Sequence, residues 1–152
     1  MIKILFICHG NICRSTMAQF VFQDMVNKAG LADEFFIDSK ATSTEEIGNP
    51  PHRGTVRKMN ELGIPMQPHF ASQVTKSDYD KFDYIIGMDK WNYKNMIRIF
   101  GGDPEDKVSL LLEFAGSNRD IADPWYTGNF DDTYRDVKEG CEALLKRCTT
   151  SV

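Results

Sequence analysis

A cysteine and an arginine near the start of the chain have the types and the spacing of an anion-binding nucleophile site. Cys8 ends a short apolar run, Arg14 follows six positions later, and an amphipathic segment begins at Ser15. The guanidinium fork of an arginine and the free backbone N–H groups at a helix N-terminus both bind oxyanions such as phosphate. Because this positive field favours negative charge on a nearby sulfur, we expect Cys8 to react as a thiolate at neutral pH. The segment therefore predicts a phosphate-binding loop with a nucleophile in its floor.

The residues between Cys8 and the helix are expected to bind phosphate mainly through their backbone N–H groups. Gly10 lets the chain turn closely, and Arg14 can hold two phosphoryl oxygens at once. Attack of a thiolate on phosphorus gives a phosphocysteine, which splits hydrolysis into two displacements. The predicted phosphate-binding residues are His9, Gly10, Asn11, Ile12, Cys13, Arg14 and Ser15.

A second motif, Asp123-Pro124-Trp125-Tyr126, carries the proton donor that a leaving alcohol or phenol needs. Pro124 stiffens the loop, so Asp123 is the predicted general acid, with Asp120 as the alternative. Trp125 and Tyr126 are predicted to form a wall on which a phenyl ring stacks. In isolation an aspartate before a proline is more often an ordinary turn residue, but its occurrence together with the cysteine–arginine loop favours a functional role.

Apolar periodicity along the chain predicts alternating strands and helices. The predicted strands are residues 2–8, 35–41 and 82–88, with another within 108–114, and the predicted helices are residues 15–29, 53–62, 90–100 and 130–148. This alternation is typical of a doubly wound α/β fold. We expect a single domain over residues 1–152 with a central parallel sheet of about four strands flanked by helices. Ligands of such sheets bind beyond the carboxyl ends of the strands, where the loop between the first strand and the first helix lies.

Composition and charge exclude several classes of function. The 152 residues contain 18 Lys and Arg against 22 Asp and Glu, a formal net charge of −4, and no basic block, so we expect no nucleic-acid binding. No apolar segment approaches the roughly 18 residues of a membrane helix, and the first apolar run is too short for a secretory leader. We therefore expect a cytoplasmic monomer without membrane insertion. The three histidines are scattered, and no metal is expected because no metal-ligand spacing occurs among Cys8, Cys13, Cys141 and Cys148.

With these motifs in this order, the chain resembles the low-molecular-weight protein tyrosine phosphatase family. The resemblance rests on the C-x-G-N-I-C-R-S loop and the D-P-x-Y motif, and it extends to residues 38–43, 47–51 and 63–65. It implies that Cys8 is the nucleophile, that Arg14 clamps the phosphate, and that Asp123 acts first as general acid and then as base. It further implies that the substrates are phosphotyrosine proteins or peptides and small aryl phosphates, that free phosphate and other oxyanions inhibit, and that no cofactor is needed.

The resemblance also assigns supporting residues. It implies a hydrogen-bonded network that holds the loop in its anion-ready shape, formed by Asn11, Ser15, Ser39 and His69. Within that network the Ser15 hydroxyl is expected near the Cys8 sulfur. Cys13 lies in the same curved loop as Cys8 and is the candidate redox partner, because a reversible disulfide would protect the nucleophile from overoxidation.

Three positions depart from the common pattern of the family, and a fourth, Ile12, matches it but bears on the choice of substrate. Thr16 replaces a proline and Gln19 replaces a glutamate, changes that we expect to affect helix capping more than chemistry. Glu45 lies where relatives often have an aromatic residue on the opposite wall of the cleft, which leaves peptide preference open. Ile12 lies where the related protein-arginine phosphatases tend to have threonine, and its apolar side chain favours an aryl phosphate over a guanidinium phosphate.

Three further functions compete with phosphatase activity. Arsenate reductases of similar fold relay oxidation through two cysteines near the middle of the chain, and residues 72–100 contain none. A phosphocysteine carrier of a sugar-transport system must resist hydrolysis, and a phosphopeptide-binding module needs no turnover. The presence of both Arg14 and Asp123 argues against these two alternatives.

Overall fold

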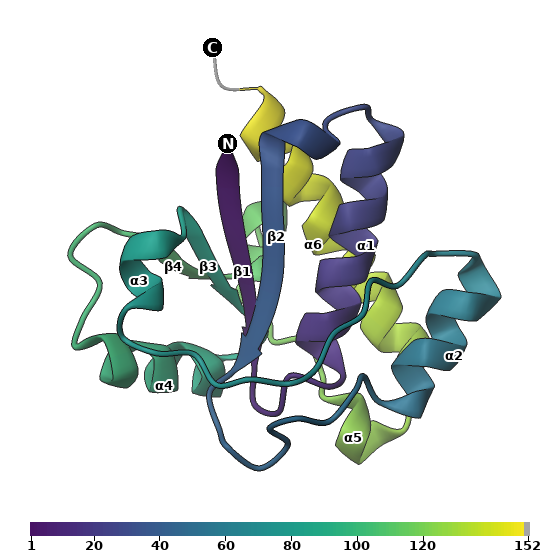
Figure 1. The fold of residues 1–152 in the computed structure, drawn as a ribbon, viewed down its shortest axis with the longest axis horizontal. Helices are drawn as coiled ribbons and strands as arrows, with labels where there is room; N and C mark the ends of the chain where they lie inside the picture. Colours follow the sequence, from purple (N-terminus) through teal and green to yellow (C-terminus); the bar gives the residue numbers. More distant parts are fainter. Residues whose placement is uncertain (151–152) are drawn as a thin grey trace.

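The protein folds around a four-stranded, all-parallel sheet, described here for residues 1–150 from a computed structural model (Figure 1). The strands are β1 (Ile2–Cys8), β2 (Phe35–Ala41), β3 (Tyr84–Gly87) and β4 (Val108–Leu110), in the order β2-β1-β3-β4. The predicted doubly wound α/β fold is confirmed. The last two residues of the predicted domain, 151 and 152, lie outside the described range.

Helices cover both faces of the sheet (Figure 1). On one face lie α1 (Arg14–Lys28) and α6 (Phe130–Thr149), which pack on each other, with α2 (Arg53–Leu62) against both. On the other face lie α3 (Asp78–Lys81) and α4 (Lys90–Phe100). The remaining elements are short: η1 (Ala32–Glu34), η2 (Leu111–Ala115) and α5 (Pro124–Thr127).

The apolar run of β1 forms the centre of two separate cores. Ile4, Phe6 and Cys8 face the α1–α6 layer, whereas Leu5 and Ile7 face the α3–α4 layer. This alternation follows from the two-residue period of a strand, and coverage on both faces explains why residues 4–8 are all apolar, whereas Lys3 lies at the exposed start of the strand. Because β1 is central, its carboxyl end at Cys8 lies at the middle of the sheet edge, in line with the start of α1.

Most predicted boundaries agree with the structure to within one or two residues, and two differences have identifiable causes. The predicted strand 82–88 is shorter, because residues just before it form α3, where the carboxylate of buried Asp78 accepts from Thr75 N and pairs with Lys40. Sequence periodicity cannot reveal a one-turn helix held by such a contact. Residues 118–129, for which no helix or strand was predicted, contain the short helix α5, with Asp123 as its N-cap and Pro124 as its first residue.

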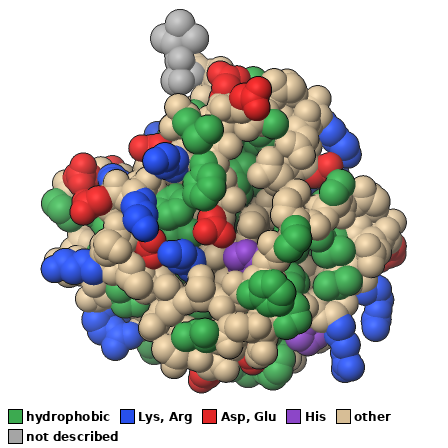
Figure 2. Space-filling view, viewed as in Figure 1, with side chains coloured by type: hydrophobic (Ala, Val, Ile, Leu, Met, Phe, Trp, Pro, Cys, Tyr) green, Lys and Arg blue, Asp and Glu red, His purple; other side chains and the backbone are tan. Residues whose placement is uncertain are grey.

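Charged side chains of both signs are interspersed on the face of the molecule in Figure 2. Among the helices of residues 1–150, none has the length and apolar character needed to cross a membrane.

Gly140 provides a test of the α6 packing. A Cβ atom built on Gly140 would lie 2.4 Å from Leu111 Cγ, which is buried. Alanine in a helix interior ordinarily stabilises by about 0.5–1 kcal/mol relative to glycine, but overpacking a core costs about 1–3 kcal/mol. We therefore expect Gly140→Ala to lower the free energy of unfolding by about 1–2 kcal/mol in urea titrations. Lys138→Ala, an exposed site on the same helix, should change it by less than about 0.5 kcal/mol. Stabilisation by Gly140→Ala would contradict the packing.

Candidate active site

The loop from Cys8 to Arg14 turns the chain from β1 into α1 and curves around the Cys8 sulfur. The sulfur lies 3.3 Å from the backbone N of Asn11 and 3.0 Å from Ser15 Oγ, and the cysteine is 3% exposed. Asn11 has a φ of 58°, the left-handed conformation that residues other than glycine seldom adopt. This conformation turns the Asn11 N–H inward, so backbone donors and the first turn of α1 face the sulfur.

The side chain of Asn11 is the centre of a buried hydrogen-bond network. Its Nδ2 donates to Ser15 Oγ at 2.8 Å and to Ser39 Oγ at 2.9 Å, while its Oδ1 lies 2.9 Å from His69 Nε2. Since Ser15 Oγ accepts from Asn11, its own proton is free to point at the Cys8 sulfur. The four residues assigned to the supporting network are thus in mutual contact, and together they hold Asn11 in its strained conformation.

His69 is neutral in this network. Burial lowers the pKa of His69, and the nearby Asp38 carboxylate opposes this effect only in part. The Nε2 atom that faces the Asn11 carbonyl oxygen must carry the proton, because a carbonyl oxygen can only accept. The ring therefore donates to Asn11, and the donor direction runs from His69 through Asn11 and Ser15 to Cys8.

Gln19 belongs to this network, although sequence reasoning expected it to affect helix capping. Ser39 Oγ donates to Gln19 Oε1, and the side chain is buried on α1. The side-chain amide oxygen of Gln19 is thus the acceptor for the hydroxyl proton of Ser39. Thr16, the other departure at the helix start, donates from Oγ1 to the carbonyl of Ile12 at 2.9 Å and so ties the loop to the first helical turn.

Arg14 is held by two separate segments of the chain, one that follows β3 and one that leads into α5. Its Nη1 lies 2.6 Å from Asp89 Oδ2 and donates to the carbonyl of Ile121 at 2.9 Å, and its Nη2 lies 3.4 Å from Asp123 Oδ2. Its buried Nε has no hydrogen-bond partner among residues 1–150. Burial opposes the charge, but Cys8, Asp89 and Asp123 outweigh it, so the pKa of Arg14 is raised above its ordinary value. The guanidinium is fixed and charged, and these contacts use three of its five N–H groups, which leaves the Nε–H and one Nη2–H for a ligand.

Asp89 directly precedes the predicted helix 90–100, and it does more than cap that helix. One carboxylate oxygen accepts from Asn92 N at 2.8 Å and caps α4, while the other holds Arg14. The signal that could have found it is its position directly after β3, because the carboxyl ends of parallel strands share one edge of the sheet.

Asp123 and its alternative Asp120 are in different places. Asp123 Oδ1 accepts from Trp125 N at 3.0 Å, and its other oxygen faces Arg14. Asp120 instead accepts from Lys90 N at 3.1 Å at the start of α4 and does not line the cavity above Cys8. Of the two candidates for the general acid, only Asp123 borders that cavity.

A cavity of about 110 Å³ lies over the Cys8 sulfur. Ile12 and Cys13 line its inner part, and all three predicted wall residues, Glu45, Trp125 and Tyr126, line its mouth. Glu45 is not free, because its carboxylate pairs with His9 Nε2 at 2.9 Å. Trp125 and Tyr126 are 57% and 83% exposed, so their aromatic surface is open to a ligand. Sequence reasoning missed Glu46, which also lines the cavity.

Comparison with known proteins identifies the family of this chain. The sequence pattern of the family named low molecular weight phosphotyrosine protein phosphatase matches residues 3–152. The chain belongs to this family. Its relative YfkJ from Bacillus subtilis, a low molecular weight protein-tyrosine-phosphatase, is 41% identical over 147 residues, which cover 95% of this chain and 94% of YfkJ. The low molecular weight phosphotyrosine protein phosphatase of Homo sapiens is 37% identical over 150 residues, with coverages of 95% and 94%.

Solved structures of the family superpose closely. The crystal structure of YfkJ matches with a TM-score of 0.94 at 39% identity, covering 99% of this chain and 98% of that one. A structure described as a Drosophila arginine phosphatase matches with a TM-score of 0.88 at 27% identity, covering 99% of this chain and 100% of that one. The predicted family is confirmed, and this protein is a phosphatase.

The other cysteines of the phosphatase are poor nucleophiles. Burial, followed by the nearby Cys8, raises the pKa of Cys13 to about 12, and burial also raises the pKa values of Cys141 and Cys148. All four cysteines are free thiols in the structure, and Cys13 lines the same cavity as Cys8. Among residues 1–150, no three His, Cys, Asp or Glu side chains form a group that could hold a metal ion.

Alkylation tests the predicted difference between the cysteines. We expect iodoacetamide at pH 7 to modify Cys8 alone, because a thiol with a pKa near 12 contains very little thiolate at that pH. Peptide mass spectrometry after short exposure gives the site, and inorganic phosphate should slow the reaction by occupying the loop. Cys8→Ser should remove the adduct. Modification of Cys13 at a comparable rate would show that the loop does not discriminate between the two sulfurs.

His69 gives a prediction about pH. Because its folded-state pKa lies below the unfolded value of about 6.5, the unfolded chain takes up a proton first as the pH falls. This site therefore makes stability decline below about pH 6.5. We expect His69→Gln to be less stable than the wild type at pH 7.5 but to lose less stability between pH 7.5 and 5.5, in urea titrations at both pH values. An equal loss in the two proteins would exclude a depressed pKa.

Proposed function

We propose that this phosphatase hydrolyses protein phosphotyrosine and small aryl phosphates through a cysteinyl-phosphate formed on Cys8, without a metal or cofactor. The observation that carries the proposal is the proximity of three groups: Cys8 and Asp123 line one cavity, and the Arg14 guanidinium, whose Nε has no partner, pairs with Asp123 beside it. A nucleophile, a phosphate clamp and a proton donor are the three parts that a two-step displacement at phosphorus needs.

In the first step, the Cys8 thiolate attacks phosphorus while the bond from phosphorus to the leaving oxygen breaks. The leaving phenolate takes a proton from the Asp123 carboxyl group. Arg14 and the backbone N–H groups of the loop hold the three phosphoryl oxygens and stabilise the charge that they gain in the transition state. The Ser15 hydroxyl, 3.0 Å from the sulfur, stabilises the thiolate before the attack.

In the second step, Asp123, now a carboxylate, removes a proton from a water molecule whose oxygen attacks phosphorus. The sulfur–phosphorus bond breaks, inorganic phosphate leaves, and the Cys8 thiolate is restored with Asp123 protonated again. A thiolate is the better leaving group in this step because the Ser15 hydroxyl donates to it. Free phosphate and other oxyanions occupy the same loop and inhibit competitively.

The lining of the cavity favours an aryl phosphate. Ile12 presents an apolar side chain, and Trp125 offers an exposed aromatic face at the mouth. A second candidate substrate is protein phosphoarginine, because one structural relative is described as an arginine phosphatase. Ile12 cannot hydrogen-bond the guanidinium nitrogens of such a substrate, so phosphotyrosine is the preferred one.

We further propose a cytoplasmic location, a signalling role and a monomeric state, with residues 1–152 as a single domain. A catalytic thiolate needs a reducing compartment, and a disulfide or a sulfinic acid at Cys8 would stop turnover. Cys13 in the same cavity is the proposed redox partner: when a peroxide oxidises the Cys8 thiolate to a sulfenic acid, the Cys13 sulfur attacks the Cys8 sulfur, water leaves, and the resulting disulfide is reversed by thiol reductants.

The first assay measures release of para-nitrophenol from para-nitrophenyl phosphate with EDTA and a reductant present. We expect many turnovers for the wild type and none above background for Cys8→Ser. Peptides with phosphotyrosine or phosphoarginine then separate the two substrate classes, with phosphotyrosine expected to have the larger kcat/KM. Loss of wild-type turnover in EDTA, or faster hydrolysis of phosphoarginine, would overturn the corresponding part of the proposal.

Asp123→Ala tests the general acid. Without a proton donor, a poor leaving group such as phenol should leave about 10²–10⁴-fold more slowly, whereas an activated nitrophenol should be affected much less in the first step. Pre-steady-state release from phenyl phosphate and para-nitrophenyl phosphate measures this difference. The control is Asp120→Ala, which lies outside the cavity and should leave both rates unchanged. Equal slowing of both substrates by Asp123→Ala would reject its role as the acid.

A further inference from the structure

A second groove adjoins the cavity over Cys8. Its volume is about 460 Å³, and it shares His9, Asp123 and Tyr126 with that cavity. From these shared residues it extends to Trp91 and Asn95 on α4. A ligand that fills the first cavity and is longer than it can therefore extend into the second groove along the protein surface.

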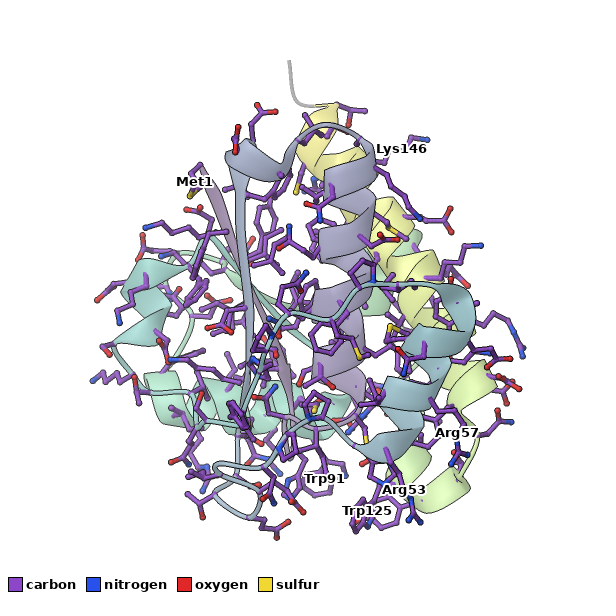
Figure 3. The ribbon with its side chains drawn as sticks, turned by 45° about the vertical axis from the view of Figure 1, so that its right-hand side comes forward. Met1, Arg53, Arg57, Trp91, Trp125 and Lys146 are labelled. Atoms are coloured by element: carbon purple, nitrogen blue, oxygen red, sulfur yellow. The ribbon has the colours of Figure 1, made fainter. Side chains whose placement is uncertain are left out.

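Trp91 is the unusual feature of this groove. Trp91 is 70% exposed. Within residues 1–150 its ring stacks on no other aromatic ring, and the Lys94 ammonium lies 5.3 Å from its centroid. Figure 3 labels Trp91 and Trp125 at the same end of the molecule, below the carboxyl ends of the strands. A tryptophan at the second position of a helix contributes nothing to the core when it faces solvent, yet tryptophans dominate the binding energy of interfaces that cover them.

We propose that Trp91 forms a subsite for a large apolar side chain next to the phosphotyrosine of a peptide substrate. This subsite rests on the proposed phosphotyrosine activity. With the phenyl ring held in the cavity, the peptide backbone lies at the shared rim near Tyr126. Consecutive Cα atoms are about 3.8 Å apart, so a residue adjacent to the phosphotyrosine lies over the second groove. Its side chain packs between the exposed rings of Tyr126 and Trp91.

The charges around the groove select a neutral occupant. Asp89 and Asp123 contribute two carboxylates to its lining against the single guanidinium of Arg14, so an acidic side chain is repelled. The Lys94 ammonium lies over the Trp91 ring and has no carboxylate within ion-pair distance among residues 1–150, so it repels a basic side chain at the Trp91 end. An uncharged aromatic or large aliphatic side chain fits both ends.

The test compares kcat/KM for phosphotyrosine peptides that have Phe, Ala, Asp or Lys on either side of the phosphotyrosine. For the wild type we expect the peptide with Phe at one of the two positions to have a kcat/KM about tenfold higher than the peptide with Ala there. The peptides with Asp or Lys should have a kcat/KM no higher than that of the Ala peptide. Trp91→Ala should abolish the preference for Phe, and Trp91→Phe should retain most of it. Tyr93→Ala is the matched control, because Tyr93 is an exposed aromatic residue of the same helix that does not line the groove. Hydrolysis of para-nitrophenyl phosphate, which is too small to reach the groove, should be the same in all four proteins.

The outcomes separate the subsite from the proposed function. Hydrolysis of all peptides without a preference for Phe, a preference that survives Trp91→Ala, or a preference for Asp or Lys would overturn the subsite and leave the function standing. If no phosphotyrosine peptide is hydrolysed, fluorescence anisotropy of the same peptides on Cys8→Ser decides. If the Phe peptide binds about tenfold more tightly than the Ala peptide and Trp91→Ala removes this difference, the subsite is upheld while the function fails. Equal binding of the Phe and Ala peptides would overturn both.

Discussion

The buried guanidinium of Arg14 is the constraint on which the rest of the site depends. A charge removed from water costs several kcal/mol unless it is paired and hydrogen-bonded. Here the partners come from two distant segments: Asp89 after β3, and the stretch before α5 that supplies the carbonyl of Ile121 and the carboxylate of Asp123. These contacts bring the predicted general acid to the loop that holds the nucleophile. They leave the Nε–H and one Nη2–H without a partner, and two oxygens of a tetrahedral oxyanion can accept from this pair.

The second constraint is the backbone of the loop itself. Asn11 at a φ of 58° costs about 1–3 kcal/mol, and this conformation persists because the surrounding side chains determine it. Ser39 lies on the neighbouring strand β2, His69 lies in the segment before α3, and Gln19 lies one turn into α1. A network of this kind is stable only when every member has a partner, so loss of one residue weakens the others. The same contacts direct the Ser15 proton toward the sulfur, which connects loop stability with reactivity.

Much of the fold could be predicted from the sequence, because local patterns encode it. The apolar run of β1 and the stripes of α1, α2, α4 and α6 have clear periods, and the loop at Cys8 lies where parallel sheets bind ligands. The second role of Asp89 and the contact of Gln19 could not be predicted, since each depends on which segments meet in three dimensions. The same holds for Trp91, whose exposure beside the site follows from the position of α4 against β3. Sequence patterns give the elements and their ends, whereas long-range contacts between polar side chains need the assembled fold.

The central claim is that phosphate passes through the Cys8 sulfur. Mixing Asp123→Ala with para-nitrophenyl phosphate, quenching in acid and measuring intact and peptide masses tests this claim most directly, because loss of the base slows hydrolysis of the intermediate. The account predicts one phosphoryl group per chain, on the peptide that contains Cys8, with stoichiometric release of nitrophenol and no adduct in Cys8→Ser. Turnover without a covalent phosphoryl group, or a phosphoryl group on His9 instead, would contradict it.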